Sequence, residues 1–206
     1  TRLPYLSLCA SGDFEMLEPM WRLYVDDFLS LNKYRTKHYF GFDDAAYFIE
    51  CVHFWGDVFN QSYGWTPQSQ RKDPLQVAGW HKWEWVAGPE LVYMMLDNYD
   101  HTLDETLLKK RIIPTADAVM RFFDNYYKTN AAGLLVMHPS QAVETWWNCT
   151  NPMPELAGLR AITARLLALP ESVTPSGSRA YWKSFMAKLP PLPTRDVPGG
   201  KALAPA

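Results

Sequence analysis

Apolar residues recur at spacings of three and four over much of the chain, a period typical of helices that bury one face. The first such stretch covers residues 13–39, opens at Gly12 and Asp13, and stops at Gly41. Its apolar positions are Phe14, Leu17, Trp21, Val25, Phe28 and Leu31. The pattern predicts one long helix over this range.

Two further stretches are apolar on nearly every side, which is typical of helices that are buried all round. One is AAYFIECVHFW at residues 45–55, which ends before Gly56. The other is ELVYMML, which lies within residues 83–99. We expect a buried helix over each range.

The next amphipathic stretch begins at Thr102 and Glu105, whose spacing is that of a capping box. It continues to about residue 128, and Pro114 is expected to kink it because proline cannot donate a backbone hydrogen bond. A brief extended piece is expected at residues 133–136.

Two more helices are predicted towards the end of the chain. Asn151 and Pro152 form a cap and first-turn pair for a helix that reaches residue 169. The last helix covers residues 175–188 and is followed by a proline-rich segment that is incompatible with a helix.

Residues 60–77 and 139–150 lack a helical period and are expected to form loops, which in compact domains often carry function. Otherwise helix follows helix with no series of strands, so the predicted fold class is all-α. Buried helices alternate with amphipathic ones, as in the two concentric layers of an (α/α)₆ toroid. A helical-repeat solenoid is the alternative, but the sequence has no fixed repeat period.

Composition narrows the class of protein. The chain has 206 residues, 48% of them apolar, with a net charge of −2. This composition predicts a sizeable core, and the near-neutral charge gives no reason to expect a nucleic-acid partner. No run of about 18 apolar residues is present, so no membrane partner is expected either. Cys9, Cys51 and Cys149 are far apart, which favours neither a disulfide framework nor a metal site, and no cofactor is expected.

Nine tryptophans and eleven tyrosines are the unusual feature of the composition. Six of the tryptophans fall into two groups, Trp65, Trp80, Trp83 and Trp85, then Trp146 and Trp147. Such side chains either fill a helical core or form flat platforms for the apolar faces of sugars. Both interpretations remain open from the sequence.

The loop that follows His138 contains the best candidate for a catalytic group. Glu144 lies close to Trp146, Trp147 and Asn151. A carboxyl group beside two indoles loses hydration, which raises its pKa and suits a general acid. The structural alternative is that Glu144 caps the next helix or forms a surface ion pair.

Three other glutamates, Glu50, Glu90 and Glu155, have both a structural and a functional interpretation. Glu155 and Glu90 each lie near the start of a predicted helix, where the helix dipole favours a negative charge. Glu50 lies three residues before His53 in an apolar stretch, so it either pairs with His53 or faces a cavity. Glu90 could likewise face a cavity instead of interacting with the helix dipole.

The order of these motifs resembles the catalytic domain of glycoside hydrolase family 95, the inverting α-L-fucosidases, and related six-hairpin glycosidases. Residues 40–57, FGFDDAAYFIECVHFWGD, look like the family segment that ends in Asp-x-Trp-Gly. Residues 87–114 are similar to its Gly-Gly-Ala-Trp-Leu helix and following turn. HPSQAVETW looks like its Pro-Ser-x-Ser-Pro-Glu-Asn loop, where the glutamate is the general acid and matches Glu144.

The sequence also departs from the family pattern. Glu50 replaces a substrate-binding histidine, His53 stands in place of the aspartate, Glu90 stands where the family has tryptophan, and Thr145 where it has asparagine. The Asp-Gly-Asn-Phe-Gly segment that supplies the general base, and the paired asparagines nearer the N-terminus, are not found. We therefore expect residues 1–206 to be one domain that is a fragment of a larger toroid.

The resemblance implies hydrolysis of a glycosidic bond with inversion, in which Glu144 protonates the leaving oxygen. The residues expected to bind substrate are Glu50, His53, Trp55, Trp83, Glu90, Thr145, Trp146, Trp147 and Asn151. The second carboxylate would come from the rest of the parent chain, so the isolated chain is expected to have little activity. The resemblance also implies secretion or a periplasmic location.

Two other functions stay open. A non-catalytic carbohydrate-binding or scaffold domain would use the same aromatic residues without Glu144 chemistry. Lyases and unsaturated-uronide hydrolases share the toroid, but they need basic groups to bind uronates, whereas the candidate cavity here is acidic.

Overall fold

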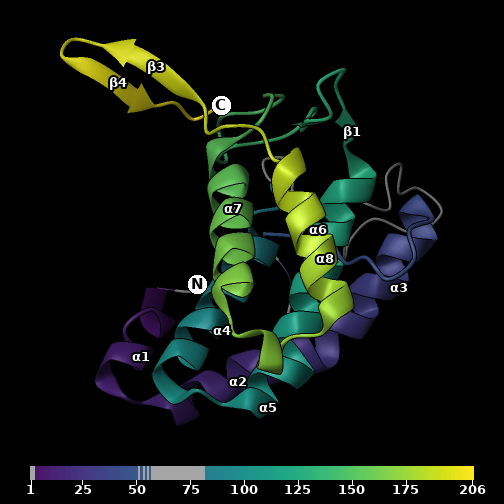
Figure 1. Ribbon diagram of the computed structural model, residues 1–206, viewed down its shortest axis with the longest axis vertical. Helices are drawn as coiled ribbons and strands as arrows, with labels where there is room; N and C mark the ends of the chain where they lie inside the picture. Colours follow the sequence, from purple (N-terminus) through teal and green to yellow (C-terminus); the bar gives the residue numbers. More distant parts are fainter. Residues whose placement is uncertain (1–2, 51, 53, 55, 57–81) are drawn as a thin grey trace, which may run out of the picture.

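The computed structural model describes residues 3–50, 52, 54, 56 and 82–206. This part of the chain is mostly helical, which confirms the predicted all-α class. Four helices lie at its centre: α4 (Ala87–Thr102), α6 (Ile113–Tyr126), α7 (Met153–Ala168) and α8 (Ser176–Lys188). In Figure 1 α1 and α2 lie at one end of this group and a β-hairpin extends from the other end.

The N-terminal region begins with a 3-10 turn, Leu3–Tyr5, and the short helix α1, Leu8–Ser11. A continuous helical path follows, made of a 3-10 turn Phe14–Leu17, α2 (Glu18–Trp21), a π-helical stretch Arg22–Asp27 and α3 (Phe28–Phe40). Gly41 ends α3 with φ 75°, a left-handed conformation that glycine adopts without strain. The predicted helix over residues 13–39 is therefore confirmed.

The predicted helix over residues 45–55 is wrong in the part that the structure describes. Residues 45–49 contain no helix, although all five side chains are buried. Their backbone bonds to other elements: Ala46 N donates to Ala118 O at 2.9 Å, and Tyr47 N donates to the Thr36 hydroxyl at 3.1 Å. A short, fully apolar run fits a buried extended segment as well as a buried helix.

Helices α4 and α7 are parallel neighbours. Pro89 meets Gly158 near the start of both helices, and further along Arg165 pairs with Asp97 and Asp100 at 2.7 Å each. Nine residues of α4 are buried, which confirms the expectation of a helix enclosed on most sides, although α4 begins at Ala87 rather than at residue 83.

Helices α6 and α8 are also parallel to each other. Asp117 of α6 accepts from Ser178 and Trp182 at 2.8 and 2.6 Å, and Asp124 pairs with Lys188 at 2.7 Å. Since α4 leads into α6 and α7 leads into α8, the centre consists of two successive helical hairpins placed side by side.

The connection between α4 and α6 differs from the predicted capping box. Asp104 is the N-cap of α5 (Glu105–Leu107), and its Oδ1 accepts from Thr106 N and Leu107 N at 2.8 and 3.2 Å. A π-helical stretch, Leu108–Ile112, then leads into α6. The irregularity comes just before Pro114, where the helix has to accommodate a residue without an N–H group.

Two small antiparallel hairpins complete the described chain. Strands β1 (Lys128–Thr129) and β2 (Leu135–Val136) confirm the extended piece expected near residue 135. Strands β3 (Thr194–Val197) and β4 (Gly200–Leu203) follow α8 and project from the helices (Figure 1). No helix within the described residues is long and apolar enough to cross a membrane.

Aromatic side chains fill much of the core. The Phe122 ring lies 5.2–5.9 Å from the rings of Phe40, Tyr47, Trp85 and Tyr126, measured between centroids. Trp21, Trp85 and Trp182 are buried, whereas Trp146 and Trp147 are about half exposed. Trp21, Trp85 and Trp182 therefore fill the core, whereas Trp146 and Trp147 remain candidates for a platform that binds a sugar face.

Candidate functional site

A hollow of about 350 Å³ lies where α4 and α7 begin. We call it the α4–α7 hollow; its lining residues are Glu84, Val86, Pro89, Glu90, Tyr93, Ala142, Val143, Pro154 and Gly158. The lining thus joins the segment before α4, the first turns of α4 and α7, and the loop at residues 139–150. Two carboxyl groups and one aromatic ring face a small, partly apolar volume, a composition common in ligand sites.

Glu84 and Glu90 supply the charge of this hollow. Glu84 is 8% exposed and precedes α4, while Glu90 lies in the first turn of α4 and is half-buried. Tyr93, one turn further along, is partly exposed, and one face of its ring is covered by Arg165, whose guanidinium carbon lies 4.5 Å from the ring centroid. The Arg165 stack holds Tyr93 in place at the edge of the hollow.

The loop at residues 139–150 is closed at its base by backbone pairing. Ser140 and Cys149 exchange backbone hydrogen bonds of 3.1 and 2.9 Å, and the buried Tyr127 hydroxyl donates to Ser140 Oγ at 3.1 Å. Gln141 is 1% exposed, and its Oε1 accepts from Trp83 N at 3.3 Å. The base of the loop is therefore fixed to the segment that precedes α4.

The tip of the loop faces outward, which corrects the expected environment of Glu144. Ala142 N donates to Trp146 O, and Trp146 N donates to Val143 O, so residues 142–146 make a tight turn. Glu144 is exposed, and the Trp147 indole donates to the Glu144 backbone carbonyl. The predicted tryptophan-lined enclosure around Glu144 is absent from the described part of the chain, because the buried side of the loop is formed by Ser140, Gln141 and Ala142.

The other predicted binding residues are only partly brought together. Glu90 lines the hollow, and Trp146, Trp147 and Thr145 are exposed on the neighbouring loop tip. Trp83 instead packs against the core, with Lys82 Nζ 5.1 Å from its ring centroid.

Asn151 has a structural role. It adopts φ 56°, and its side-chain oxygen accepts from Met137 N at 2.9 Å, which ties the end of the loop to β2. Pro152, rather than Asn151, is the N-cap residue of α7. His53 and Trp55 lie outside the described residues, as does the predicted loop at residues 60–77.

A buried carboxyl group lies behind the hollow. Glu155, in the first turn of α7, is 0% exposed, and neither of its carboxyl oxygens has a hydrogen-bond partner within the described chain. Burial raises the pKa of Glu155 well above its usual range, and the carboxylates of Glu84 and Glu50 raise it further. Nearby N–H groups of Glu155 and Trp85 oppose this rise only in part. Burial therefore favours the protonated form of Glu155 over its carboxylate.

Sequence reasoning placed Glu155 as a partner of the helix dipole and passed over Glu84. A signal for the burial of Glu155 was present, since residues 155, 159, 162 and 166 follow one helical stripe and the last three are Leu, Ile and Leu. For Glu84 the flanking Trp83 and Trp85 were the only local indication. No property of the sequence reveals that Glu84 and Glu90 line one hollow together with residues 142 and 143.

Within the described residues, no group of three or more His, Cys, Asp or Glu side chains is placed to hold a metal ion. No family model, curated protein or solved structure matches this chain. A function for the chain therefore depends on the chemistry of its own residues.

Proposed function

We propose that the chain is part of a glycoside hydrolase-like (α/α)₆ domain that hydrolyses O-glycosidic bonds with inversion, with Glu144 as general acid. One observation carries the proposal: the exposed carboxyl group and two half-exposed indoles lie on a loop whose residues 142 and 143 line the α4–α7 hollow. Sugars are bound by carboxylates that accept from hydroxyl groups and by aromatic faces that cover C–H surfaces.

The helical arrangement supports the toroid part of the proposal. A toroid of this kind needs inner helices that are parallel to one another and outer helices that are parallel to one another. Here α4 and α7 are parallel, as are α6 and α8, and both α4 and α7 begin at the hollow. The parent chain would add further hairpins and the second carboxylate.

The exposure of Glu144 sets a condition on this mechanism. A general acid must deliver a proton to the leaving oxygen, and it does so best where water is excluded. A sugar stacked on Trp146 and Trp147 would exclude water from Glu144. Glu84 and Glu90 would meanwhile accept hydrogen bonds from sugar hydroxyl groups in the hollow.

The parent protein with Glu144→Gln tests the proposal. With aryl glycosides of neutral sugars, the variant should lower kcat by about 10²–10⁴-fold for poor leaving groups. It should lower kcat much less for nitrophenolates, which leave without a proton. Glu171→Gln, an exposed carboxylate beyond the opposite end of α7, is the matched control. Equal losses for all leaving groups, or no loss, would contradict the assigned role.

The exposed position of Glu144 also favours a second candidate, a carbohydrate-binding domain without catalysis. In that case Glu144→Gln would leave hydrolysis by the parent protein unchanged, while Trp146→Ala would abolish sugar binding. The same pair of variants therefore separates the two functions.

A further inference from the structure

A second and larger cavity lies at the opposite end of α4 from the α4–α7 hollow. It has a volume of about 800 Å³ and is bordered by α2, the last turns of α4 and the stretch that leads into α6. We call it the Arg111 cavity. Its size falls within the range of small-molecule sites, roughly 300–1,000 Å³.

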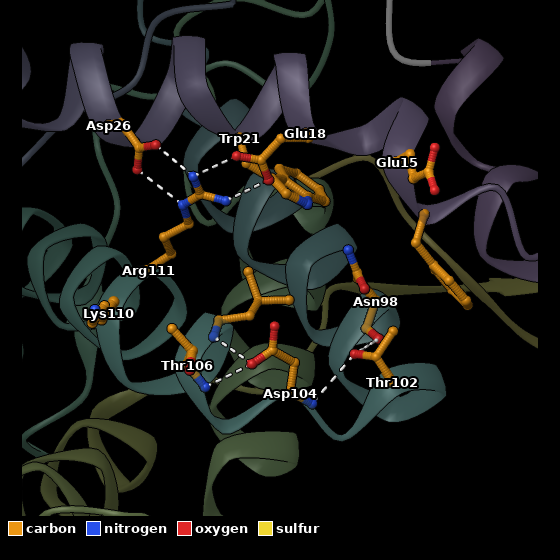
Figure 2. Close-up of a pocket in the computed structure, with 12 residues that line it drawn as sticks. Glu15, Glu18, Trp21, Asp26, Asn98, Thr102, Asp104, Thr106, Lys110 and Arg111 are labelled. Atoms are coloured by element: carbon orange, nitrogen blue, oxygen red, sulfur yellow. Dashed lines mark hydrogen bonds and ion pairs between the residues drawn. The ribbon is translucent and has the colours of Figure 1, made fainter.

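The fixed frame of this cavity is an ion-pair cluster. The Arg111 guanidinium binds Glu18 with hydrogen bonds of 2.7 and 2.8 Å and binds Asp26 through Nε at 2.9 Å. Figure 2 shows both carboxylates turned towards Arg111 from the N-terminal helical path. Arg111 thus binds both carboxylates at once, which orders the cavity wall and leaves the cluster with an excess of one negative charge.

A buried donor without a partner points to a ligand. Trp21 is 1% exposed and lines the cavity, and its indole Nε1 has no hydrogen-bond acceptor in the described chain. An unmet N–H group in such a place is costly, so an occupant with an acceptor oxygen would be stabilised. In Figure 2 the Asn98 side chain, itself 6% exposed, points towards the indole.

Other groups around the cavity can bind hydroxyl groups. Asp104 uses Oδ1 to cap α5, and its other carboxyl oxygen points into the cavity in Figure 2. Thr106 and Lys110 lie on the same side, and the half-buried Phe14 adds an apolar surface. Acceptors, donors and an apolar wall in one cavity suit a polyhydroxylated molecule better than an apolar one.

The charges decide the ligand class. Four carboxylates, Glu15, Glu18, Asp26 and Asp104, outnumber Lys110 and Arg111, which disfavours a phosphate or a uronate. Arg111 already binds Glu18 and Asp26, so these two carboxylates are less available to a cationic ligand. We propose that the Arg111 cavity binds a neutral saccharide of one to three units and that the Trp21 indole donates to one of its oxygens. This binding site is separate from the α4–α7 hollow and does not depend on any catalytic activity there.

Binding to the chain with Trp146→Ala and Trp147→Ala tests this inference apart from the proposed function, because these substitutions remove the other aromatic surface. The probes are maltotriose, cellotriose and mannotriose, with trigalacturonate and the glucosamine trimer as anionic and cationic controls. The indole N–H signal that disappears in Trp21→Phe is assigned to Trp21 by nitrogen–proton NMR. At least one neutral trisaccharide should shift this signal and bind more tightly than either charged control.

Trp21→Phe should then weaken that binding by about threefold to tenfold, the effect of one lost hydrogen bond, and Asn98→Ser should weaken it as well. Trp182→Phe is the matched control, since its indole N–H already bonds to Asp117 at 2.6 Å in another part of the core. It should leave binding unchanged but lower the Tm more than Trp21→Phe does. No shift of the Trp21 signal, tighter binding of a charged trisaccharide, or unchanged affinity in Trp21→Phe would overturn the inference.

Discussion

The backbone of Gly158 in α7 packs directly against the ring of Pro89 in α4: a Cβ atom added at Gly158 would lie 2.9 Å from Pro89 Cβ. Such a contact is closer than carbon atoms tolerate, and the proline ring cannot rotate away. The absence of a side chain at position 158 therefore sets the distance between the two helices that border the α4–α7 hollow.

Gly158→Ala should consequently destabilise the protein, although alanine is the better helix former. The clash is expected to cost about 1–3 kcal/mol, more than the gain in helix propensity of about 1 kcal/mol. Gly177→Ala in α8 is the control, because an added Cβ there would meet nothing within 4 Å. Urea denaturation should show a lower midpoint for Gly158→Ala and an unchanged or higher one for Gly177→Ala. A stabilised Gly158→Ala variant would mean that the helices can separate without loss.

The buried Glu155 predicts an unusual dependence of stability on pH. Its folded-state pKa is raised, so between the unfolded and folded pKa values the native protein keeps a proton that the unfolded chain releases. Stability contributed by this group is therefore complete below the unfolded pKa and is lost as pH rises, by at most about 1.4 kcal/mol per pH unit.

Glu155→Gln should remove that loss, because the amide stays neutral at every pH. We expect the variant and the wild type to have similar unfolding free energies near pH 4, and the variant to be the more stable of the two at pH 7–8. Urea titrations at half-unit pH intervals measure the difference, with the exposed Glu171→Gln as control. Parallel curves for wild type and Glu155→Gln would show that Glu155 does not titrate differently on folding.

The contacts of Arg111 predict a loss of stability that depends on both salt and pH. Arg111→Lys cannot make the two-pronged contacts with Glu18 and Asp26, so it should cost about 1 kcal/mol at low salt. Because all three groups are partly exposed, 1 M NaCl should reduce this cost. Lys109→Gln, which breaks only the exposed pair with Glu105, should cost about 0.5 kcal/mol or less.

The stability that the Arg111 contacts contribute depends on pH in the opposite direction to the contribution of Glu155. The hydrogen bonds from Arg111 lower the pKa of Glu18, so the stability they contribute is present above the unfolded pKa and is lost as pH falls through the folded pKa. The gap between wild type and Arg111→Lys should therefore narrow between pH 6 and pH 3. A gap that is constant with pH and salt would indicate lost packing of the arginine stem rather than lost ion pairs.

Helices with one apolar face were predictable from the sequence, because their period of 3.6 residues is a local property. The helical path to Phe40, α7 and α8 were found within a few residues of their ends. The helix predicted over residues 45–55 is absent at residues 45–49 because the backbone of this segment bonds to other elements. Its partners, Ala118 O and the Thr36 hydroxyl, cannot be inferred from the local pattern. The β3–β4 hairpin was hidden by the proline-rich composition of the segment after α8.

The candidate site was predictable in its residue types but not in its geometry. Glu90, Trp146 and Trp147 were recognised, and all lie at or beside the α4–α7 hollow. The sequence does not show which carboxyl groups the tertiary packing will cover. A covered acid was expected at Glu144, whereas the structure covers Glu155 instead. Glu144 is exposed and Glu155 is buried.

The central claim is that a sugar occupies the α4–α7 hollow and rests on Trp146 and Trp147. Intermolecular nuclear Overhauser effects between a carbon-13-labelled neutral oligosaccharide and the side chains of the chain test this most directly. The account predicts contacts from sugar protons to the Trp146 and Trp147 indoles and to the ring of Tyr93. A bound sugar that contacts none of these three rings would contradict it.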